Sequence, residues 1–284
     1  MTRVPVLMYH SISERPPPET APLAVRPGAF ADQMALLKDR GFTPISFSAL
    51  AVIIGRAEGV QADTTTRPGS HDHGEVGGMP TKPVVITFDD GYADFHRHAL
   101  PVLDDLGFAA TVFVTTGWLA DAGADAAGRP LDRMLSWSQT REAAAHGIEM
   151  GGHSHSHPQL DQLPDGELRD ELIRNKELLE DRLGRDVTSM AYPYGYSSAR
   201  VRRAVRASGY QTACAVANDL AAERHDVLAI PRLTVRWSTS LESFGRVAEG
   251  QGVPLIYLKD RVLTKGYAIV RRTRFAARQL TGHG

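Results

Sequence analysis

Two adjacent carboxylates stand where an apolar segment of the sequence ends. Asp89 and Asp90 directly follow the Val- and Ile-rich segment 84–88 and precede Gly91. Successive side chains of a strand point to opposite faces, so adjacent acids at a strand end need not share one task. One can bind a metal ion while the other takes up protons. The alternative is a plain strand-to-loop turn, for which Asp-Asp-Gly is also suited.

A histidine-rich tract follows a second short strand segment. His153, His155 and His157 alternate with serines between a glycine pair and a proline. A strand would place all three imidazoles on one face, whereas a single turn brings His153 and His157 together at metal-ligand spacing. The flanking glycines and proline favour a turn, so we predict this pair. Together with Asp90 it leaves coordination positions open for water and substrate, as a hydrolytic metal site requires. A surface loop with fortuitous histidines is the alternative.

A third candidate segment is Tyr192-Pro193-Tyr194-Gly195, which ends the expected strand 189–192. This sequence is typical of a rigid turn. Its aromatic rings suit stacking on a sugar ring, and its backbone amides could hold an oxyanion. An ordinary loop is the alternative reading of these four residues.

Strand segments alternate with amphipathic helical segments along almost the whole chain. Strands are expected at residues 4–9, 43–47, 84–88, 111–115, 148–151, 189–192, 212–216 and 229–235. Helical patterns cover about 29–40, 93–106 and the leucine stripe from Leu168 to Leu183, each followed by a glycine. Seven or eight strand–helix units in about 250 residues favour a parallel barrel. The three candidate segments all fall at strand ends, where barrel enzymes hold their active sites.

Taken together and in this order, the three segments resemble the motifs of the polysaccharide deacetylases, the NodB-homology enzymes of carbohydrate esterase family 4. The resemblance covers about residues 4–244. It implies a distorted (β/α)7 barrel that removes N-acetyl groups from sugars or polysaccharides. By motif position it implies that Asp90, His153 and His157 hold a divalent metal ion and that Asp89 is the catalytic base. Zinc suits these donors best, and cobalt, nickel or iron would fit them as well.

The chain departs from the family pattern at three places. Ala191 stands where many relatives carry an arginine. No aspartate–tryptophan motif is evident, and Asn218-Asp219 is the nearest feature. The segment 230–235 lacks the histidine that acts as general acid in many relatives. The identity of the acid is therefore open.

His10 is our candidate for the acid that protonates the leaving amine. The opening segment 8–12 resembles a subset of the family, and His10 ends the first expected strand, so it would face the same barrel mouth. A purely structural His10 and a protonated Asp89 acting alone are the alternatives. His225 lies in a charged segment that reads as a solvated loop and is a poorer candidate. The tetrahedral oxyanion would meet the metal and a backbone N–H near Tyr194.

The composition limits the remaining classes of function. The chain has 284 residues, 42% of them apolar and 23% charged, and a formal net charge of -1, so no overall field attracts it to nucleic acid. Cys214 is the single cysteine, which excludes an intrachain disulfide and a thiolate metal site. We find neither a signal-peptide core nor an apolar run of bilayer length, and we therefore expect a cytoplasmic protein.

Two segments interrupt the strand–helix rhythm of the expected barrel domain, residues 1–250. Residues 56–82 are rich in Gly, Thr and charge and indicate a flexible insertion, in which His71 and His73 read as solvated. Residues 251–284 form a basic tail. Apolar residues between its charges predict an amphipathic helix for anionic lipid or a partner protein, or a helix packed on the barrel with a charged outer face.

Two other functions use the same residues. One is a metal-dependent amidase or esterase acting on a small or lipid-linked substrate. The other is a carbohydrate-binding barrel that has lost catalysis, an idea prompted by the missing acid motif. The intact Asp89-Asp90 pair and the two histidines favour an enzyme.

Overall fold

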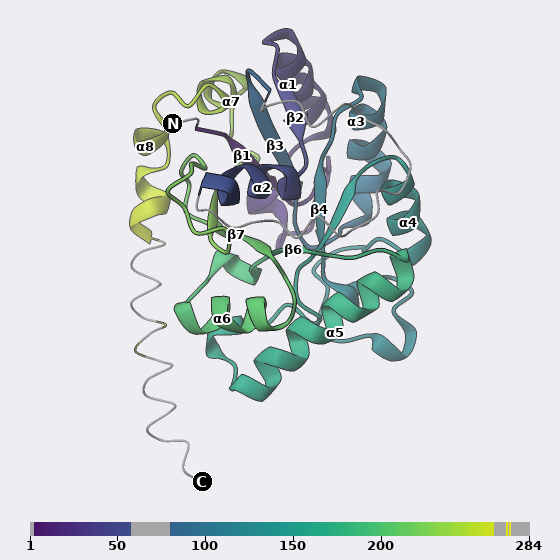
Figure 1. The fold of residues 1–284 in the computed structure, drawn as a ribbon. Helices are drawn as coiled ribbons and strands as arrows, with labels where there is room; N and C mark the ends of the chain where they lie inside the picture. The colour runs from purple at the N-terminus through teal and green to yellow at the C-terminus, as the bar shows by residue number, and fades with distance from the viewer. Residues whose placement is uncertain (1–2, 58–79, 264–270, 272, 274–284) are drawn as a thin grey trace.

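A computed structural model describes residues 3–57, 80–263, 271 and 273 (Figure 1). Its strands are β1 (Val6–Tyr9), β2 (Thr43–Ile45), β3 (Pro83–Phe88), β4 (Thr111–Val114), β5 (Glu149–Gly152), β6 (Ser189–Ala191), β7 (Thr212–Val216) and β8 (Ile230–Thr234). Its α-helices are α1 (Pro27–Asp39), α2 (Phe47–Ala57), α3 (Leu100–Leu106), α4 (Trp137–Ala145), α5 (Asp165–Leu183), α6 (Ala199–Ala207), α7 (Leu241–Ala248) and α8 (Val253–Ile256).

The strands form one parallel sheet that closes on itself. Their order is β1-β8-β7-β6-β5-β4-β3-β2, and β1 also pairs with β3. The ring therefore contains seven strands, while β2 adds to the amino-terminal half of β3 through Thr43, Pro44 and Ile45. This closed parallel barrel with surrounding helices confirms the predicted distorted (β/α)7 fold (Figure 1).

The eight predicted strands all occur, with ends shifted by two residues at most. The helix expected over 93–106 instead begins with a π-helical turn, Phe95–Ala99, before α3. Pro101 explains the change, because it has no N–H to bond the carbonyl four residues earlier, and the Leu100 N–H instead bonds the carbonyl of Phe95. Gly41, Gly107 and Gly184 adopt the positive φ expected of residues that end helices.

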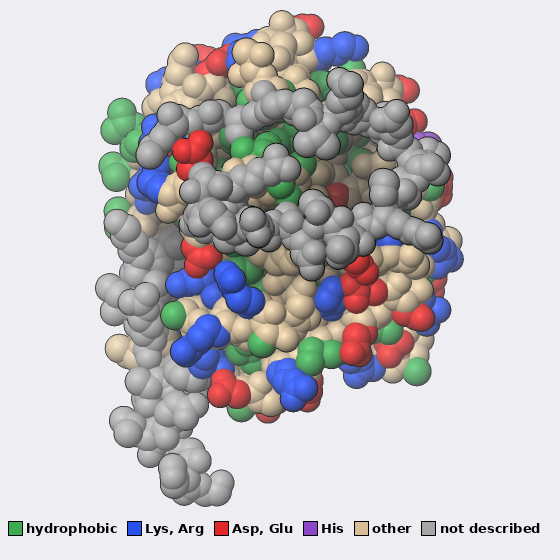
Figure 2. All heavy atoms as spheres, viewed as in Figure 1, with side chains coloured by type: hydrophobic (Ala, Val, Ile, Leu, Met, Phe, Trp, Pro, Cys, Tyr) green, Lys and Arg blue, Asp and Glu red, His purple; other side chains and the backbone are tan. Residues whose placement is uncertain are grey.

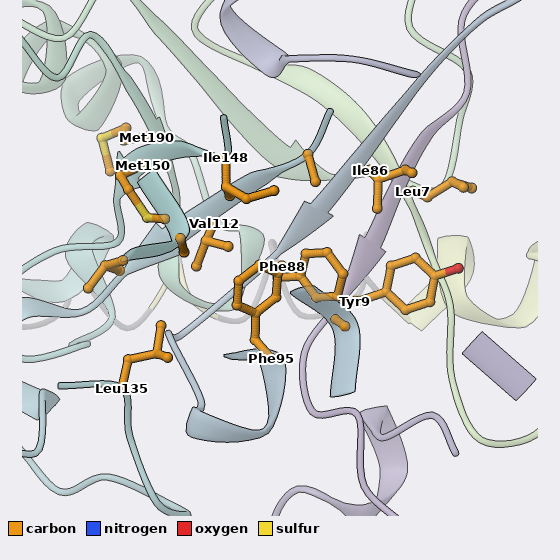
Figure 3. Close-up of a cluster of buried hydrophobic side chains, with 14 of the residues drawn as sticks. Leu7, Tyr9, Ile86, Phe88, Phe95, Val112, Leu135, Ile148, Met150 and Met190 are labelled. Carbon is orange, nitrogen blue, oxygen red and sulfur yellow. The ribbon is translucent and has the colours of Figure 1, made fainter. Parts of the chain in front are cut away.

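Side chains of the strands alternate between the helices and the barrel interior. Tyr9 and Phe88 point outward and stack at 5.4 Å between ring centroids, and Phe95 packs on Phe88 at 4.8 Å (Figure 3). The interior of the barrel holds a second apolar cluster, which Phe47 of α2 closes by packing edge-on against Phe113. Toward the carboxyl ends of the strands, the side chains that point into the barrel become polar. The apolar cluster therefore excludes water from the barrel interior beneath this polar mouth.

The two irregular segments are only partly described. The predicted insertion at 56–82 begins inside α2, and Lys82 at its other end pairs with Glu249 at 2.7 Å. His71 and His73 lie outside the described residues, and the domain boundary at 250 stays a prediction. The start of the tail is helical, and its buried Tyr257 donates a hydrogen bond to the Thr234 carbonyl. Within the described parts of the chain, no helix has the length and apolarity that a bilayer crossing requires.

Candidate metal centre

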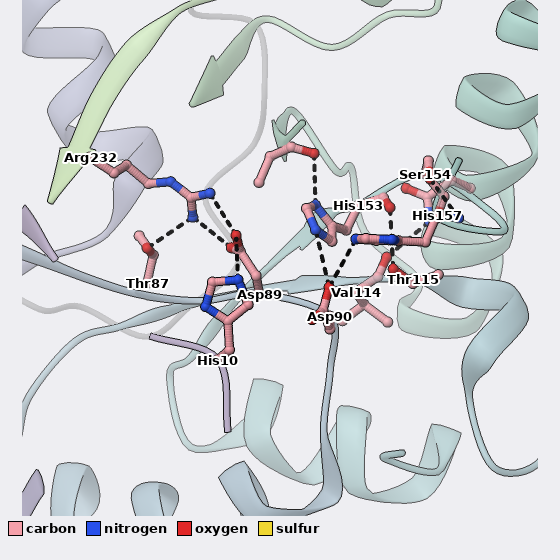
Figure 4. Close-up of polar contacts among 12 residues, drawn as sticks. His10, Thr87, Asp89, Asp90, Val114, Thr115, His153, Ser154, His157 and Arg232 are labelled. Atoms are coloured by element: carbon pink, nitrogen blue, oxygen red, sulfur yellow. Dashed lines mark hydrogen bonds and ion pairs between the residues drawn. The ribbon is translucent and has the colours of Figure 1, made fainter. Parts of the chain in front are cut away.

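Asp90, His153 and His157 converge at the mouth of the barrel (Figure 4). The Asp90 carboxylate follows β3, and both imidazoles follow β5. Asp90 Oδ1 lies 3.3 Å from His153 Nε2 and 3.2 Å from His157 Nε2. One donor atom from each residue lies within 4.8 Å of the others. This is the spatial arrangement that one shared ion requires.

Backbone turns, rather than a helix, bring the donors together. Residues 153–157 contain no helical turn, and both Ser154 and His157 adopt φ 62°. Asp90 leaves the strand alternation through φ 73°. Tyr194 and Asn218 are the other non-glycine residues with positive φ among those the structure describes. Both line the cavity at the barrel mouth that also contains Asp90 and His157. Such conformations cost free energy and persist where the surrounding structure enforces them, often at functional sites.

The hydrogen bonds of the donors fit a bound cation. His153 Nδ1 lies 2.8 Å from the carbonyl of Ala191, so it carries the proton and leaves the Nε2 lone pair facing Asp90. Asp90 Oδ1 is buried and accepts no hydrogen bond of good geometry within the described structure. A buried carboxylate oxygen without a donor is costly, and a divalent ion would satisfy it.

Electrostatics at the centre also favours a positive charge. Burial alone would raise the pKa of Asp90, but contacts with His153 and His157 hold it well below the ordinary value. Burial lowers the pKa of His153, yet the charges of Asp89 and Asp90 outweigh burial and raise it. The two carboxylates therefore stabilise a cation here, and a metal ion would take the place of the proton.

Side chains of helix α5 hold the histidine-bearing loop, residues 153–157, in place. The Glu171 carboxylate accepts hydrogen bonds from the backbone N–H groups of His155 and Ser156 at 2.9 and 2.8 Å. One turn later, buried Asn175 donates to the Ser154 carbonyl at 2.7 Å and accepts from the Tyr210 hydroxyl. These contacts fix the loop that carries both imidazoles, and neither residue was predicted from the sequence.

Asp89 takes a different partner from Asp90. It continues the inward alternation of β3 and meets Arg232 of β8, whose guanidinium nitrogens lie 2.5 and 2.6 Å from the two carboxylate oxygens. Arg232 is fully buried and also contacts Thr87 (Figure 4). Burial would raise the pKa of Asp89, but the neighbouring guanidinium holds it below the ordinary value. Asp89 is thus kept ionised, as a base must be.

One cavity joins these groups. It has a volume of about 410 Å³ and is lined by Asp89, Asp90, His153, His157 and, across from them, His10. His10 Nε2 lies 3.9 Å from Asp89 Oδ2. Burial lowers the pKa of His10, and the charge of Asp89 partly offsets this effect. Every ionisable side chain predicted for catalysis or metal binding therefore faces a common space.

The predicted aromatic segment contributes only one of its three side chains to this cavity. Tyr194 is 52% exposed, lines the cavity and packs on His157 at 4.8 Å between ring centroids. Tyr192 is fully buried and donates its hydroxyl proton to the Leu228 carbonyl, and Pro193 is buried as well. The expectation that Tyr192 and Pro193 contact substrate is wrong, because the turn points them into the core. Tyr196, which we did not predict, lines the cavity instead.

Comparisons with known proteins agree with this fold. Residues 77–213 match the family model for polysaccharide deacetylase. YxkH of Bacillus subtilis, named as a polysaccharide deacetylase, is 26% identical over 249 residues, which cover 87% of this chain and 76% of that protein. The poly-beta-1,6-N-acetyl-D-glucosamine N-deacetylase of Escherichia coli is 27% identical over 139 residues, 46% of this chain but 18% of that protein.

A solved structure shares the architecture. The deacetylase PplD of Streptococcus pyogenes superposes with a TM-score of 0.69 at 24% identity, over 85% of this chain and 96% of that one. The closed barrel of this chain is the fold of that deacetylase, and the Asp90, His153 and His157 cluster lies at its mouth. In sequence the chain is similar to polysaccharide deacetylases.

Proposed function

We propose that this enzyme is a metal-dependent hydrolase that removes N-acetyl groups from an acetylated polysaccharide. The observation that carries the proposal is the convergence of Asp90, His153 and His157 in the cavity that also holds Asp89. The name of the Escherichia coli relative, a poly-N-acetylglucosamine N-deacetylase, supports the substrate class. Two imidazoles and one carboxylate favour zinc, and cobalt, nickel or iron suit the same donors.

A divalent ion in this site would act as a Lewis acid and lower the pKa of a bound water. The chain's own residues do the rest. Asp89 is the base that accepts the water proton, since Arg232 keeps it ionised and its carboxylate reaches the cavity. His10 is the acid that protonates the leaving amine, because it faces the same cavity and the Asp89 carboxylate, 3.9 Å from His10 Nε2, favours the protonated imidazole. A protonated Asp89 acting alone remains the alternative.

The cavity wall orients the sugar. Tyr194 and Tyr196 lie with their rings stacked at 6.1 Å between centroids and form an aromatic edge beside His157. Such rings suit the apolar face of a pyranose. Because Tyr194 lines the cavity, a backbone N–H near it is the proposed oxyanion donor.

Acetate release is the direct test of this proposal. We expect release from acetylated chito-oligosaccharides or poly-N-acetylglucosamine, loss of it with a chelator, and recovery with zinc, cobalt or manganese. Loss on chelation follows from the open three-donor site, because the ion supplies several kcal/mol of the catalytic stabilisation. A chain that holds stoichiometric metal yet releases no acetate from any of these glycans would favour a non-catalytic carbohydrate-binding barrel instead.

A further inference from the structure

The helical segment after α7 carries a stripe of apolar side chains on its outer surface. Leu255, Leu258 and Val262 are 77%, 58% and 63% exposed. Leu255 lies on α8, and Leu258 and Val262 are four residues apart on the helical stretch that follows the turn at Tyr257. Ile256 and Leu263 flank them with smaller exposure. Figure 2 shows hydrophobic side chains gathered at the left edge, where Figure 1 places α8. The predicted charged outer face concerns mainly basic residues outside the described part of the chain and stays a prediction.

The opposite face of the segment is fixed to the barrel and reaches the catalytic cavity. Tyr257 is buried and bonds the Thr234 carbonyl of β8. Asp260 pairs with Arg236 at 3.2 Å, and both line the catalytic cavity. Leu263 lines it as well. The apolar stripe therefore lies beside the entrance to the active site rather than on a remote surface.

Charge is divided sharply along the chain at this segment. From Lys259 to the end there are seven basic residues and one acidic residue, Asp260. The preceding 258 residues contain 25 of the basic and 32 of the acidic residues. Residues 1–258 therefore carry a formal net charge of -7, and residues 259–284 carry a formal net charge of +6. Apolar side chains next to concentrated positive charge are typical of helices that lie on anionic lipid.

We propose that residues 255–263 dock the enzyme on an anionic lipid surface, so that its substrate is an acetylated sugar carried by that membrane. This inference rests on the proposed deacetylase function and adds where the sugar is found. The stripe enters the interface between headgroups and acyl chains, and the basic residues meet the headgroups. A second copy of the chain fits the stripe less well, because pairing it would bring two segments of charge +6 together.

Vesicle binding tests the docking step. The probes are vesicles of pure phosphatidylcholine and vesicles with about one third phosphatidylglycerol, a content chosen to mimic an anionic leaflet. The test variant is Leu255→Glu/Leu258→Glu/Val262→Glu, none of which lines the cavity. Val52→Glu is the matched control, since Val52 is an exposed apolar residue on α2 (41%). We expect anionic vesicles to bind the wild type and Val52→Glu, and the triple variant to lose at least ~10-fold in partitioning.

Equal vesicle binding by the triple variant, or no vesicle binding by the wild type, would overturn the docking proposal. So would light scattering that shows a dimeric wild type and a monomeric triple variant. Salt provides an independent check, because raising it from about 0.05 M to about 0.5 M should weaken binding to the anionic vesicles.

Enzyme activity then separates this proposal from the proposed function. The triple variant should deacetylate a soluble chito-oligosaccharide at the wild-type rate. On the same oligosaccharide linked to a lipid in anionic vesicles, the wild type should exceed the triple variant by about 10-fold, since docking raises the local substrate concentration. Equal rates on the lipid-linked substrate would refute the inference alone, whereas no activity on either substrate would refute the deacetylase function.

Discussion

Asp89→Asn is expected to lower kcat for acetate release by about 10³-fold, within the range that a general base typically contributes. The amide keeps the shape of the side chain but cannot accept the proton of the attacking water. Asp89 lies in the cavity beside the proposed metal ligands, where Arg232 keeps it ionised, whereas Asp260 of the same cavity is paired with Arg236. The measurement is acetate release together with metal content for each variant.

A matched variant separates loss of the base from loss of a buried ion pair. Asp161→Asn removes the carboxylate that pairs with Arg271 at 2.9 Å, away from the catalytic cavity. It should retain nearly full activity. Should Asp89→Asn keep wild-type activity with metal bound, Asp89 is not the base. Should both variants lose activity together, the loss reflects folding rather than chemistry.

Arg232→Met is expected to destabilise the fold by about 3–5 kcal/mol, the usual cost of leaving one member of a buried ion pair alone. Arg232 is fully buried and its guanidinium contacts both oxygens of Asp89 and the Thr87 hydroxyl. Methionine fills similar space but leaves the Asp89 charge uncompensated. Urea unfolding of the two proteins measures the difference in free energy.

The double variant tests the cause of this loss. In Arg232→Met/Asp89→Asn the buried charge is gone, so stability should return most of the way to that of the wild type. Activity should stay absent, because the base is also gone. A double variant no more stable than Arg232→Met would show that lost packing against Phe113, whose ring centroid lies 5.6 Å from the guanidinium carbon, causes the loss instead of the uncompensated charge.

The strands and their order could be predicted because parallel barrels bury both faces of each strand. Segments such as Val84–Ile86 of β3 are therefore apolar throughout and stand out from the amphipathic helices. The details of turns were less predictable. The π-helical turn before α3 depends on Pro101, whose effect is confined to the local backbone hydrogen bonds.

The site was predictable where its residues are consecutive. Asp89-Asp90 and His153 to His157 each come from one strand end, so spacing alone relates their side chains. Tyr192 and Pro193 were misplaced because a turn sends successive side chains to opposite sides, and the sequence does not show which side faces the cavity.

The partners that hold the site come from distant elements and were missed. Arg232 reaches Asp89 from β8, 143 residues further along the chain. One signal was present, namely a charged residue amid the apolar strand Ile230–Thr234, which must be paired if buried. Likewise Asn175 interrupts the leucine stripe of α5 at a buried position.

Metal stoichiometry is the most direct test of the central claim that three side chains share one ion. Elemental analysis should find about one divalent ion per chain in the wild type, and far less in Asp90→Ala and His157→Ala, since such a site needs three protein donors. His155→Gln is the control, because His155 lies in the same tract but contacts Thr116 instead. Full metal content in Asp90→Ala, or its loss in His155→Gln with the fold intact, would contradict the proposed centre.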